Sequence, residues 1–247
     1  MTEPVRLAKR LAEMLACSRR EAEQYITGGF VRVDGVVVQE PQHRVQNQKI
    51  EVSPDATLLG VAPVTLLLHK PSGSEAGWGA PAGASRAADL LLPDRLWGED
   101  ISGLSPLKKH FAEQQLLTPL APRASGLVVF SQDWRIARKL TEDAGVMEHE
   151  VLVEVSGEIK PGGLERLNRL DHGFTFNGVP LGAAKVSWQS EKRLRFALKG
   201  ERPGQIAYLC ECVGLQVEAM KRIRIGRVAM SSLPVGQWRY LLPHEKF

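Results

Sequence analysis

The chain has 247 residues, of which 43% are hydrophobic and 24% are charged, and its formal net charge is +4. This composition is that of a folded globular protein, long enough for one or two cored domains, and it argues against a disordered or fibrous chain. The mild positive charge favours a polyanionic partner only weakly, and the sequence lacks the apolar run of about 20 residues that a membrane-spanning helix needs.

The cysteines indicate a reducing compartment. There are three, an odd number without paired spacing, which argues against a disulfide framework. Cys210 and Cys212 lie two residues apart, but no second Cys or His pair completes a zinc site, so no metal is expected. The charged N-terminus has no signal-peptide core. We therefore expect a cytoplasmic protein that is not associated with a membrane.

Residues 1–52 predict a small domain of two helices and short strands. Apolar residues recur at helical spacing from residue 5 to residue 15. Ser18 is a suitable N-cap for a second helix, and Glu21 completes a capping box. Asp34-Gly35 lies between two apolar runs, the strongest short signal for a β-hairpin.

Residues 53–64 predict a linker and residues 65–247 a larger domain. A strand is expected before Pro71, a long Gly- and Ala-rich loop over 72–87, and a buried strand over 127–130. Helices are expected near 133–144, 162–170 and 204–214, scattered among strands near 148–157, 183–189, 193–199 and 215–230. Because the helices and strands do not alternate regularly, we expect an α+β fold with a mixed sheet, not a doubly wound parallel one.

The first domain resembles an S4-type RNA-binding domain. The segment "CSRREAEQYITGGFVRVDG" matches that family almost position by position. The resemblance implies that the two helices and the hairpin dock on RNA. The expected phosphate contacts are Arg6, Lys9, Arg10, Ser18, Arg19, Arg20 and Arg32. Contacts of this kind position RNA and make binding salt-dependent, but they do not read its sequence.

The larger domain resembles the ribosomal RNA pseudouridine synthases that carry an N-terminal S4 domain, the RsuA/RluB/RluF type. The resemblance covers nearly the whole chain and is carried by "LLLHKPSG", "SGLVVFSQD", "HEVLVEVSGEI" and "VEAMKRIRIGRVAMSSLPVGQWRYL". It implies a mainly antiparallel sheet, a structured ribosomal RNA as partner, a monomer, and no metal or organic cofactor.

The same resemblance makes the loop "LTPLAPRASGL" unusual. In the family this loop reads Gly-Arg-Leu-Asp, and the Asp attacks the uridine as its glycosidic bond moves from nitrogen to carbon. When Ser125-Gly126-Leu127 is set on the family's Ser-Gly-Leu, Ala121 falls on the Asp. Alanine offers no acid, base or nucleophile.

Other family positions differ as well. Val151 occupies the place of a Tyr that packs on the target base. The family's helix motif retains Arg202, Gln205 and Ile206, and Arg202 matches the basic residue that would pair with the Asp. Arginines of the motif are replaced by Gly204, Ala207 and Tyr208.

Neither of two other aspartates in the sequence occupies a position from which it could replace the family's catalytic Asp. Asp133 lies beyond the far end of the strand that follows the loop. Arg169-Leu170-Asp171 repeats an Arg-Leu-Asp but has no Ser-Gly-Leu behind it, so we interpret it as a chance match. His69, before the Lys-Pro turn, is expected to be structural.

Basic residues also occur near the C-terminus. Lys221, Arg222 and Arg224 lie in one expected strand, and their family counterparts are basic, so we expect them to contact RNA. Arg222 and Arg224 are two residues apart, which predicts that they share a face of the sheet.

Three functions follow from these observations. The first is an RNA-binding homologue of a pseudouridine synthase that has lost the isomerisation. The second is an active isomerase that uses another acid, such as Glu75 or Asp133. The third is a protein-interaction module on a retired enzyme scaffold, which predicts no RNA affinity at moderate salt.

Overall fold

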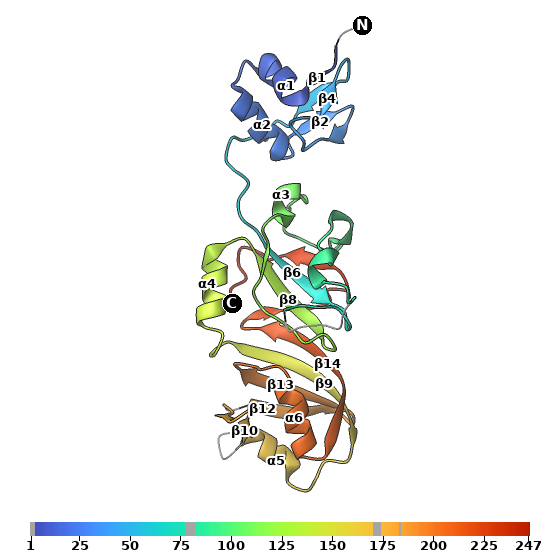
Figure 1. The fold of residues 1–247 in the computed structure, drawn as a ribbon, viewed down its shortest axis with the longest axis vertical. Coiled ribbons are helices and arrows are strands. Elements are labelled where there is room, and N and C mark those ends of the chain that lie inside the picture. Colours follow the sequence, from blue (N-terminus) through green and yellow to red (C-terminus); the bar gives the residue numbers. More distant parts are fainter. Residues whose placement is uncertain (1–2, 78–82, 170–173, 183) are drawn as a thin grey trace. The chain divides into compact units, whose positions relative to one another are not determined.

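The computed structural model describes residues 3–77, 83–169, 174–182 and 184–247 and separates the chain into two compact units (Figure 1). The first unit comprises Met1–Pro63 and Ser105–Glu113, and the second comprises Val64–Leu104 and Gln114–Phe247. Residues Ser105–Glu113, which include the short helix α3 (Lys108–Phe111), belong to the first unit. The sequence did not predict this assignment. The backbone N–H of Lys108 donates a hydrogen bond of 2.8 Å to the side chain of Gln39 there.

The first unit contains the expected helices α1 (Leu7–Leu15) and α2 (Arg19–Thr27). Ser18 and Glu21 form the predicted capping box, in which each side chain accepts a bond from the other residue's backbone N–H. The hairpin of β2 (Val31–Val33) and β3 (Val36–Val37) turns at Asp34 and Gly35, which both have positive φ. β5 (Ile50–Val52) pairs with β2, and β1 (Val5–Arg6) pairs with β4 (Arg44–Val45).

A nine-stranded mixed sheet forms the second unit. Its order is β12–β13–β9–β14–β8–β6–β16, with β15 paired to β14 and β7 paired to β8. Only the β14–β8 pair is parallel among the described strands, so the expected mixed, mainly antiparallel α+β fold is confirmed. The strand bounds are β6 Thr65–Lys70, β7 Gln115–Leu116, β8 Ser125–Ser131, β9 Glu148–Gly157, β12 Ala184–Ser190, β13 Arg193–Lys199, β14 Leu215–Ile225, β15 Val228–Ala229 and β16 Trp238–Tyr240.

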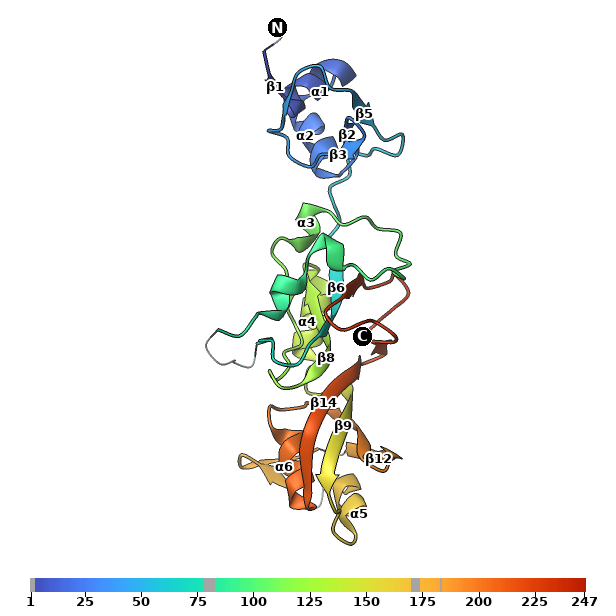
Figure 2. The ribbon, with the colours of Figure 1, turned by 90° about the vertical axis from the view of Figure 1, so that its right-hand side faces the viewer.

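Helices cover parts of this sheet. α4 (Trp134–Glu142) packs beside β8, and α5 (Gly163–Asn168) and α6 (Gln205–Cys212) pack on the half built from β12, β13, β9 and β14 (Figure 1). A small hairpin joins β10 (Thr175–Phe176) to β11 (Val179–Pro180). Two 3₁₀ turns, Ala87–Leu90 and Pro93–Arg95, were not anticipated from the sequence. The long strands β9 and β14 lie side by side in both views (Figure 2).

The described helices include none long and apolar enough to cross a membrane.

The edge strand β12 is capped by a side chain. The N–H of Val186 donates to Oδ1 of Asn168 at 2.8 Å, and Nδ2 of Asn168 donates to the carbonyl of Val186 at 2.9 Å. The amide of Asn168 therefore takes the place that a peptide group of a further strand would occupy.

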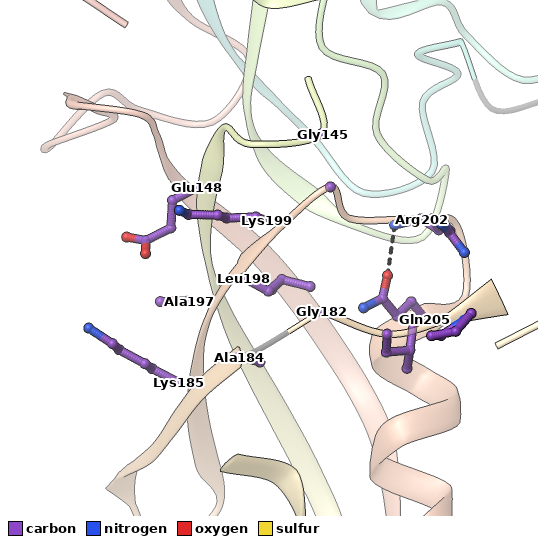
Figure 3. Close-up of a pocket in the computed structure, with 13 residues that line it drawn as sticks. Gly145, Glu148, Gly182, Ala184, Lys185, Ala197, Leu198, Lys199, Arg202 and Gln205 are labelled. Carbon is purple, nitrogen blue, oxygen red and sulfur yellow. Dashed lines mark hydrogen bonds between the residues drawn. The ribbon is translucent and has the colours of Figure 1, made fainter. Parts of the chain in front are cut away.

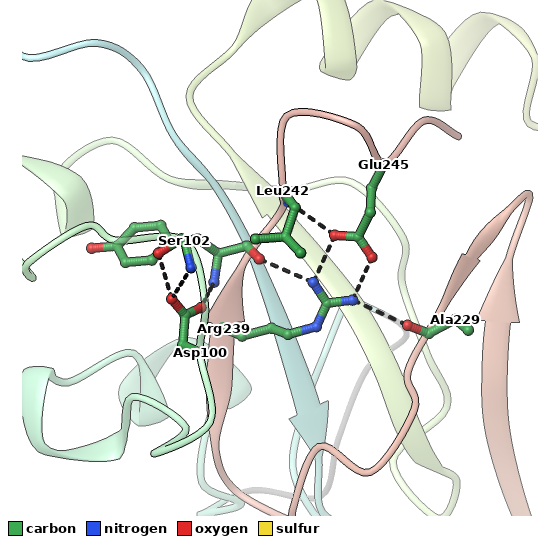
Figure 4. A network of polar contacts seen from close by, with 7 residues as sticks. Asp100, Ser102, Ala229, Arg239, Leu242 and Glu245 are labelled. Atoms are coloured by element: carbon green, nitrogen blue, oxygen red, sulfur yellow. Dashed lines mark hydrogen bonds and ion pairs between the residues drawn. The ribbon is translucent and has the colours of Figure 1, made fainter.

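The C-terminal segment is fixed by a buried ion pair (Figure 4). Arg239 is 6% exposed, and its two terminal nitrogens each lie 2.7 Å from a carboxylate oxygen of Glu245. Burial raises the pKa of Glu245, but the bonds from Arg239 and from the N–H of Leu242 outweigh burial and lower it. The side chain of Arg239 therefore binds Glu245 and fixes the C-terminal segment.

Candidate functional site

Hydrogen bonds to strand β8 and within the loop fix the backbone of the loop between β7 and β8. The Leu117 N–H donates to the carbonyl of Val129 at 2.9 Å, and Oγ1 of Thr118 accepts from the Val129 N–H at 2.8 Å. The Ala124 N–H donates to the carbonyl of Ala121 at 3.0 Å and closes a turn. Ala121 is half-buried at the start of this turn.

The side chain of Arg222, on β14, binds the backbone of this loop. Its guanidinium donates to the carbonyls of Thr118, Pro119 and Leu127 at 2.7, 3.0 and 2.9 Å. The side chain is 1% exposed, and burial lowers its pKa to about 10. The planar fork of an arginine suits three separate acceptors, so Arg222 fixes the path of the loop. Arg222 was expected to contact RNA, but its guanidinium is buried under the loop and is not exposed to a phosphate.

Lys70 joins the Lys-Pro turn to the same loop. Its Nζ donates to the carbonyls of Pro71, Ser74 and Pro122 at 2.9, 2.8 and 3.1 Å. Burial, with the nearby charge of Arg222, lowers the pKa of this lysine to about 8. The Gly73 N–H adds a bond of 2.7 Å to the carbonyl of Pro122.

Gly126 permits the parallel strands β8 and β14 to approach. It has φ +114°, and a Cβ atom there would lie 2.5 Å from the backbone nitrogen of Arg222 and closer still to its carbonyl oxygen. Only glycine fits such a position, which explains the Ser-Gly step at the end of the loop.

The two carboxylates that the sequence offered as substitutes, Asp133 and Glu75, lie at different distances along the fold from the loop. Asp133 caps α4, where its Oδ1 accepts from the Arg135 N–H at 2.9 Å, at the opposite end of β8. Glu75 lies in the segment whose next residue, Ala76, accepts a bond of 2.9 Å from the Leu120 N–H. Glu75 is also close enough to Lys70 to favour its charged form.

Glu201 is a buried acid that the sequence did not single out. Its side chain is 8% exposed and lies 3.4 Å from Nδ1 of His149. Burial lowers the pKa of His149, and Glu201 opposes that effect. Glu201 also favours the charged form of Arg222, so a carboxylate, an imidazole and a guanidinium lie in one region.

The structure also describes the expected site positions Val151, Arg202 and Tyr208. Val151 is 2% exposed and belongs to the core formed under α6. The Arg202 N–H donates to Oε1 of Gln205 at 3.1 Å, just before α6 begins. Tyr208 packs its ring 5.4 Å from that of Phe176. Leu170 and Asp171 lie outside the described residues.

His69 is buried, as a structural residue would be. It is 2% exposed, and its Nδ1 lies 2.7 Å from the carbonyl of Leu233.

The basic residues expected to bind RNA in the first unit are at its surface. Ser18 also serves as the helix cap, Arg19 lies 3.7 Å from Glu23, and Arg32 donates to the carbonyl of Gly35 at 3.0 Å. The remaining basic residues of the set have no ion pair within the described part of the chain. All seven expected residues are exposed: Arg6, Lys9, Arg10, Ser18, Arg19, Arg20 and Arg32.

The basic residues of β14 are divided between the two faces of the sheet. Arg222 pairs in register with Val151, but Arg224 pairs with Glu150, because a β-bulge at Ile223 shifts the register. The prediction that Arg222 and Arg224 share a face is therefore wrong. Arg224 forms ion pairs with Glu148 and Glu150, and Lys221 is half-buried.

No cluster of three or more His, Cys, Asp or Glu residues suited to a metal ion occurs among the residues that the structure describes.

Comparisons with known proteins agree with this architecture. Residues 5–48 match the S4 domain family. An uncharacterized RNA pseudouridine synthase of Mycobacterium bovis is 30% identical over 247 residues, which cover 98% of this chain and 91% of the relative. The dual-specificity RNA pseudouridine synthase RluF of Escherichia coli is 27% identical, with 98% of this chain and 77% of the relative covered.

A solved structure shares the fold along nearly the whole length. The crystal structure of a pseudouridylate synthase superposes with a TM-score of 0.58 at 18% identity and covers 96% of both chains. The identity and coverage of the relative from M. bovis settle the family. The chain belongs to the RNA pseudouridine synthase family and carries an N-terminal S4 domain.

Proposed function

We propose that this protein binds structured ribosomal RNA and does not convert uridine to pseudouridine. The proposal rests on Ala121, which falls on the catalytic aspartate when Ser125-Gly126-Leu127 is aligned with the family's Ser-Gly-Leu. Without a carboxylate the loop cannot attack the uridine, and loss of such a group typically costs many powers of ten in rate.

The register of the loop supports this assignment of Ala121. Gly126 is fixed by its approach to Arg222, and Ser125 and Leu127 follow the family pattern around it. The loop is also well built, because Arg222 and Lys70 hold it through its carbonyls. A rigid loop with no reactive group fits a protein that keeps the RNA-facing shape of the family without its chemistry.

RNA binding is supported by the first unit. Its basic residues are exposed, and four of them, Arg6, Lys9, Arg10 and Arg20, have no ion pair among the described residues. Relatives are named as RNA pseudouridine synthases or as ribosomal large subunit pseudouridine synthases, which suggests RNA as the class of partner here as well.

The test measures pseudouridine and binding in the same tubes. Ribosomal RNA transcripts are incubated with the full-length protein at low and moderate salt, and pseudouridine is quantified after digestion. We expect salt-dependent binding without pseudouridine. Binding that vanishes at moderate salt would instead favour a protein-interaction module, and pseudouridine formation would disprove the loss of catalysis.

A second candidate is an active isomerase that uses a different acid. Two observations favour it: Glu75 adjoins the loop through Ala76, and Glu201 lies buried beside His149 and near Arg222. If pseudouridine forms, Glu75→Gln and Glu201→Gln are compared with Asp133→Asn, whose carboxylate caps α4. The variant that abolishes product while retaining RNA affinity identifies the acid.

A further inference from the structure

The hairpin of β12 and β13 carries opposite charge at its two ends. The strands are joined by a turn at residues 191–192, and at the other end Ala184 lies opposite Leu198 and Lys185 opposite Ala197. We call the latter the open end, defined by Lys185, Lys199 and Arg202, and the former the turn end, defined by Glu154, Glu191, Lys192, Arg193 and Glu218.

The open end is a cationic hollow. A pocket of about 640 Å³ is lined by Lys185, Lys199 and Arg202, with Glu148 as its one acid among the described residues. Glu148 is already paired with Arg224. The three cations have no ion pair within the described part of the chain, and Lys185 and Lys199 are exposed. The surface therefore has positive charge that the protein does not itself neutralise.

The turn end has the opposite character. Its hollow, about 690 Å³, is lined by three glutamates and two basic residues. Arg193 lies 2.6 Å from Glu154, so the rest of the charged lining consists of one base, Lys192, and two acids, Glu191 and Glu218. A polyanion that approached the hairpin would be attracted to the open end and repelled from the turn end.

The directions of the side chains indicate what kind of anion fits. In Figure 3, Lys185 and Lys199 extend to one side of β13, on the side of Glu148, whereas Arg202 lies on the other side, next to Gln205. Cations that diverge in this way cannot enclose one small anion. They can each meet a separate phosphate of an extended chain that crosses the end of the strands.

We propose that the open end is a second RNA-backbone contact, separate from the S4 domain, at which Lys185, Lys199 and Arg202 each neutralise a phosphodiester. The inference rests on the proposed RNA-binding function and names a surface that serves it. These contacts add affinity and orientation without reading base identity.

The experiment compares two double variants of the full-length protein. Lys185→Ala/Lys199→Ala removes two charges from the open end. Lys160→Ala/Lys192→Ala, the matched control, removes two exposed lysines away from it. Dissociation constants for a ribosomal RNA transcript are measured from 50 to 300 mM salt, after thermal unfolding shows that both variants are folded. The open-end variant is expected to bind roughly tenfold more weakly at low salt, with a salt slope smaller by about 1 to 2, and the control to stay within about twofold of wild type.

The outcomes separate this inference from the proposed function. Equal affinities and salt slopes for the two double variants would overturn the open-end contact while leaving RNA binding intact. If the wild-type protein binds no transcript, the proposed function fails first, and with it the contact. Inorganic pyrophosphate is tested as a second probe, because binding of pyrophosphate that depends on Lys185 and Lys199 would mark a small-anion site and contradict a backbone contact.

Discussion

Two buried cations, Arg222 and Lys70, hold the loop before β8 through carbonyl groups and not through an acid. Each of the two groups donates three hydrogen bonds to backbone oxygens of the loop, of strand β8 or of the Lys-Pro turn. Carbonyl dipoles stabilise a charge less than a carboxylate does, so burial lowers the pKa of both side chains. The shape of the loop therefore depends on side chains that lie outside it.

Replacing Ala121 by aspartate is expected to leave the protein without isomerase activity. The new carboxylate would still lack the arginine and the tyrosine that the family pattern has at Gly204 and Val151, and Val151 is packed in the core. Pseudouridine in ribosomal RNA transcripts is the readout, with Ala121→Asn as the control for size. Substantial product from Ala121→Asp alone would show that the rest of the site has kept its function.

Arg222→Met is expected to destabilise the protein by about 3 kcal/mol or more, because three buried carbonyls lose their donor. Arg224→Met serves as the control. Arg224 lies on the same strand, but its ion pair with Glu150 is partly exposed, so the loss in the free energy of unfolding should be much smaller. Urea unfolding gives the free energies, and trypsin cleavage after the exposed Arg123 reports loosening of the loop. Equal effects of the two variants would argue against the clamp.

At the scale of elements, the contact between β8 and β14 depends on Gly126, because this residue has no Cβ atom. The two strands form the parallel pair of the sheet at Ser125 and Gly126, opposite Lys221 and Arg222. A Cβ at Gly126 would meet backbone atoms that cannot rotate away. The glycine thus sets the register by which the loop reaches Arg222.

Gly126→Ala is expected to cost several kcal/mol, because both the positive φ and the approach to β14 would be lost. Gly73→Ala separates these effects, since Gly73 has φ +92° but a Cβ atom at this position would meet no other atom within 4 Å. Its cost should be about 1 kcal/mol, from backbone strain alone. Thermal unfolding of the two variants measures the difference, and equal losses would show that backbone strain alone, and not strand approach, sets the cost.

At the scale of the whole molecule, buried histidines make stability depend on pH. Burial lowers the pKa of His69 and of His149 below the ordinary value of 6.5. The unfolded chain therefore binds more protons than the folded one as the pH falls through 6.5, and the free energy of unfolding decreases.

We expect the free energy of unfolding, measured by urea titration, to be lower at pH 5.5 than at pH 7.5 by on the order of 1 kcal/mol for each histidine. His69→Gln should reduce this difference, whereas His43→Gln, whose side chain is exposed in the first unit, should not. An unchanged pH dependence in His69→Gln would mean that His69 binds its proton equally well in both states.

The parts of this fold that follow from sequence are those with local causes. The Ser18 cap and the Asp34-Gly35 turn act within a few residues, and both appear in the structure as expected. The bulge at Ile223 has no local cause, because it results from pairing with β9, and it separates Arg222 from Arg224. Likewise, the burial of Lys70 and of Glu201 depends on distant segments that meet only in the folded chain.

Asn168 has a consequence for the protein at high concentration. A sheet of this size with a free edge at β12 offers a template on which a strand from another molecule could add, and repeated addition leads to polymers. Because the amide of Asn168 occupies both hydrogen-bonding groups of Val186, that template is interrupted in the middle of the strand. One side chain at the end of α5 thus acts as a terminator of sheet growth at this edge.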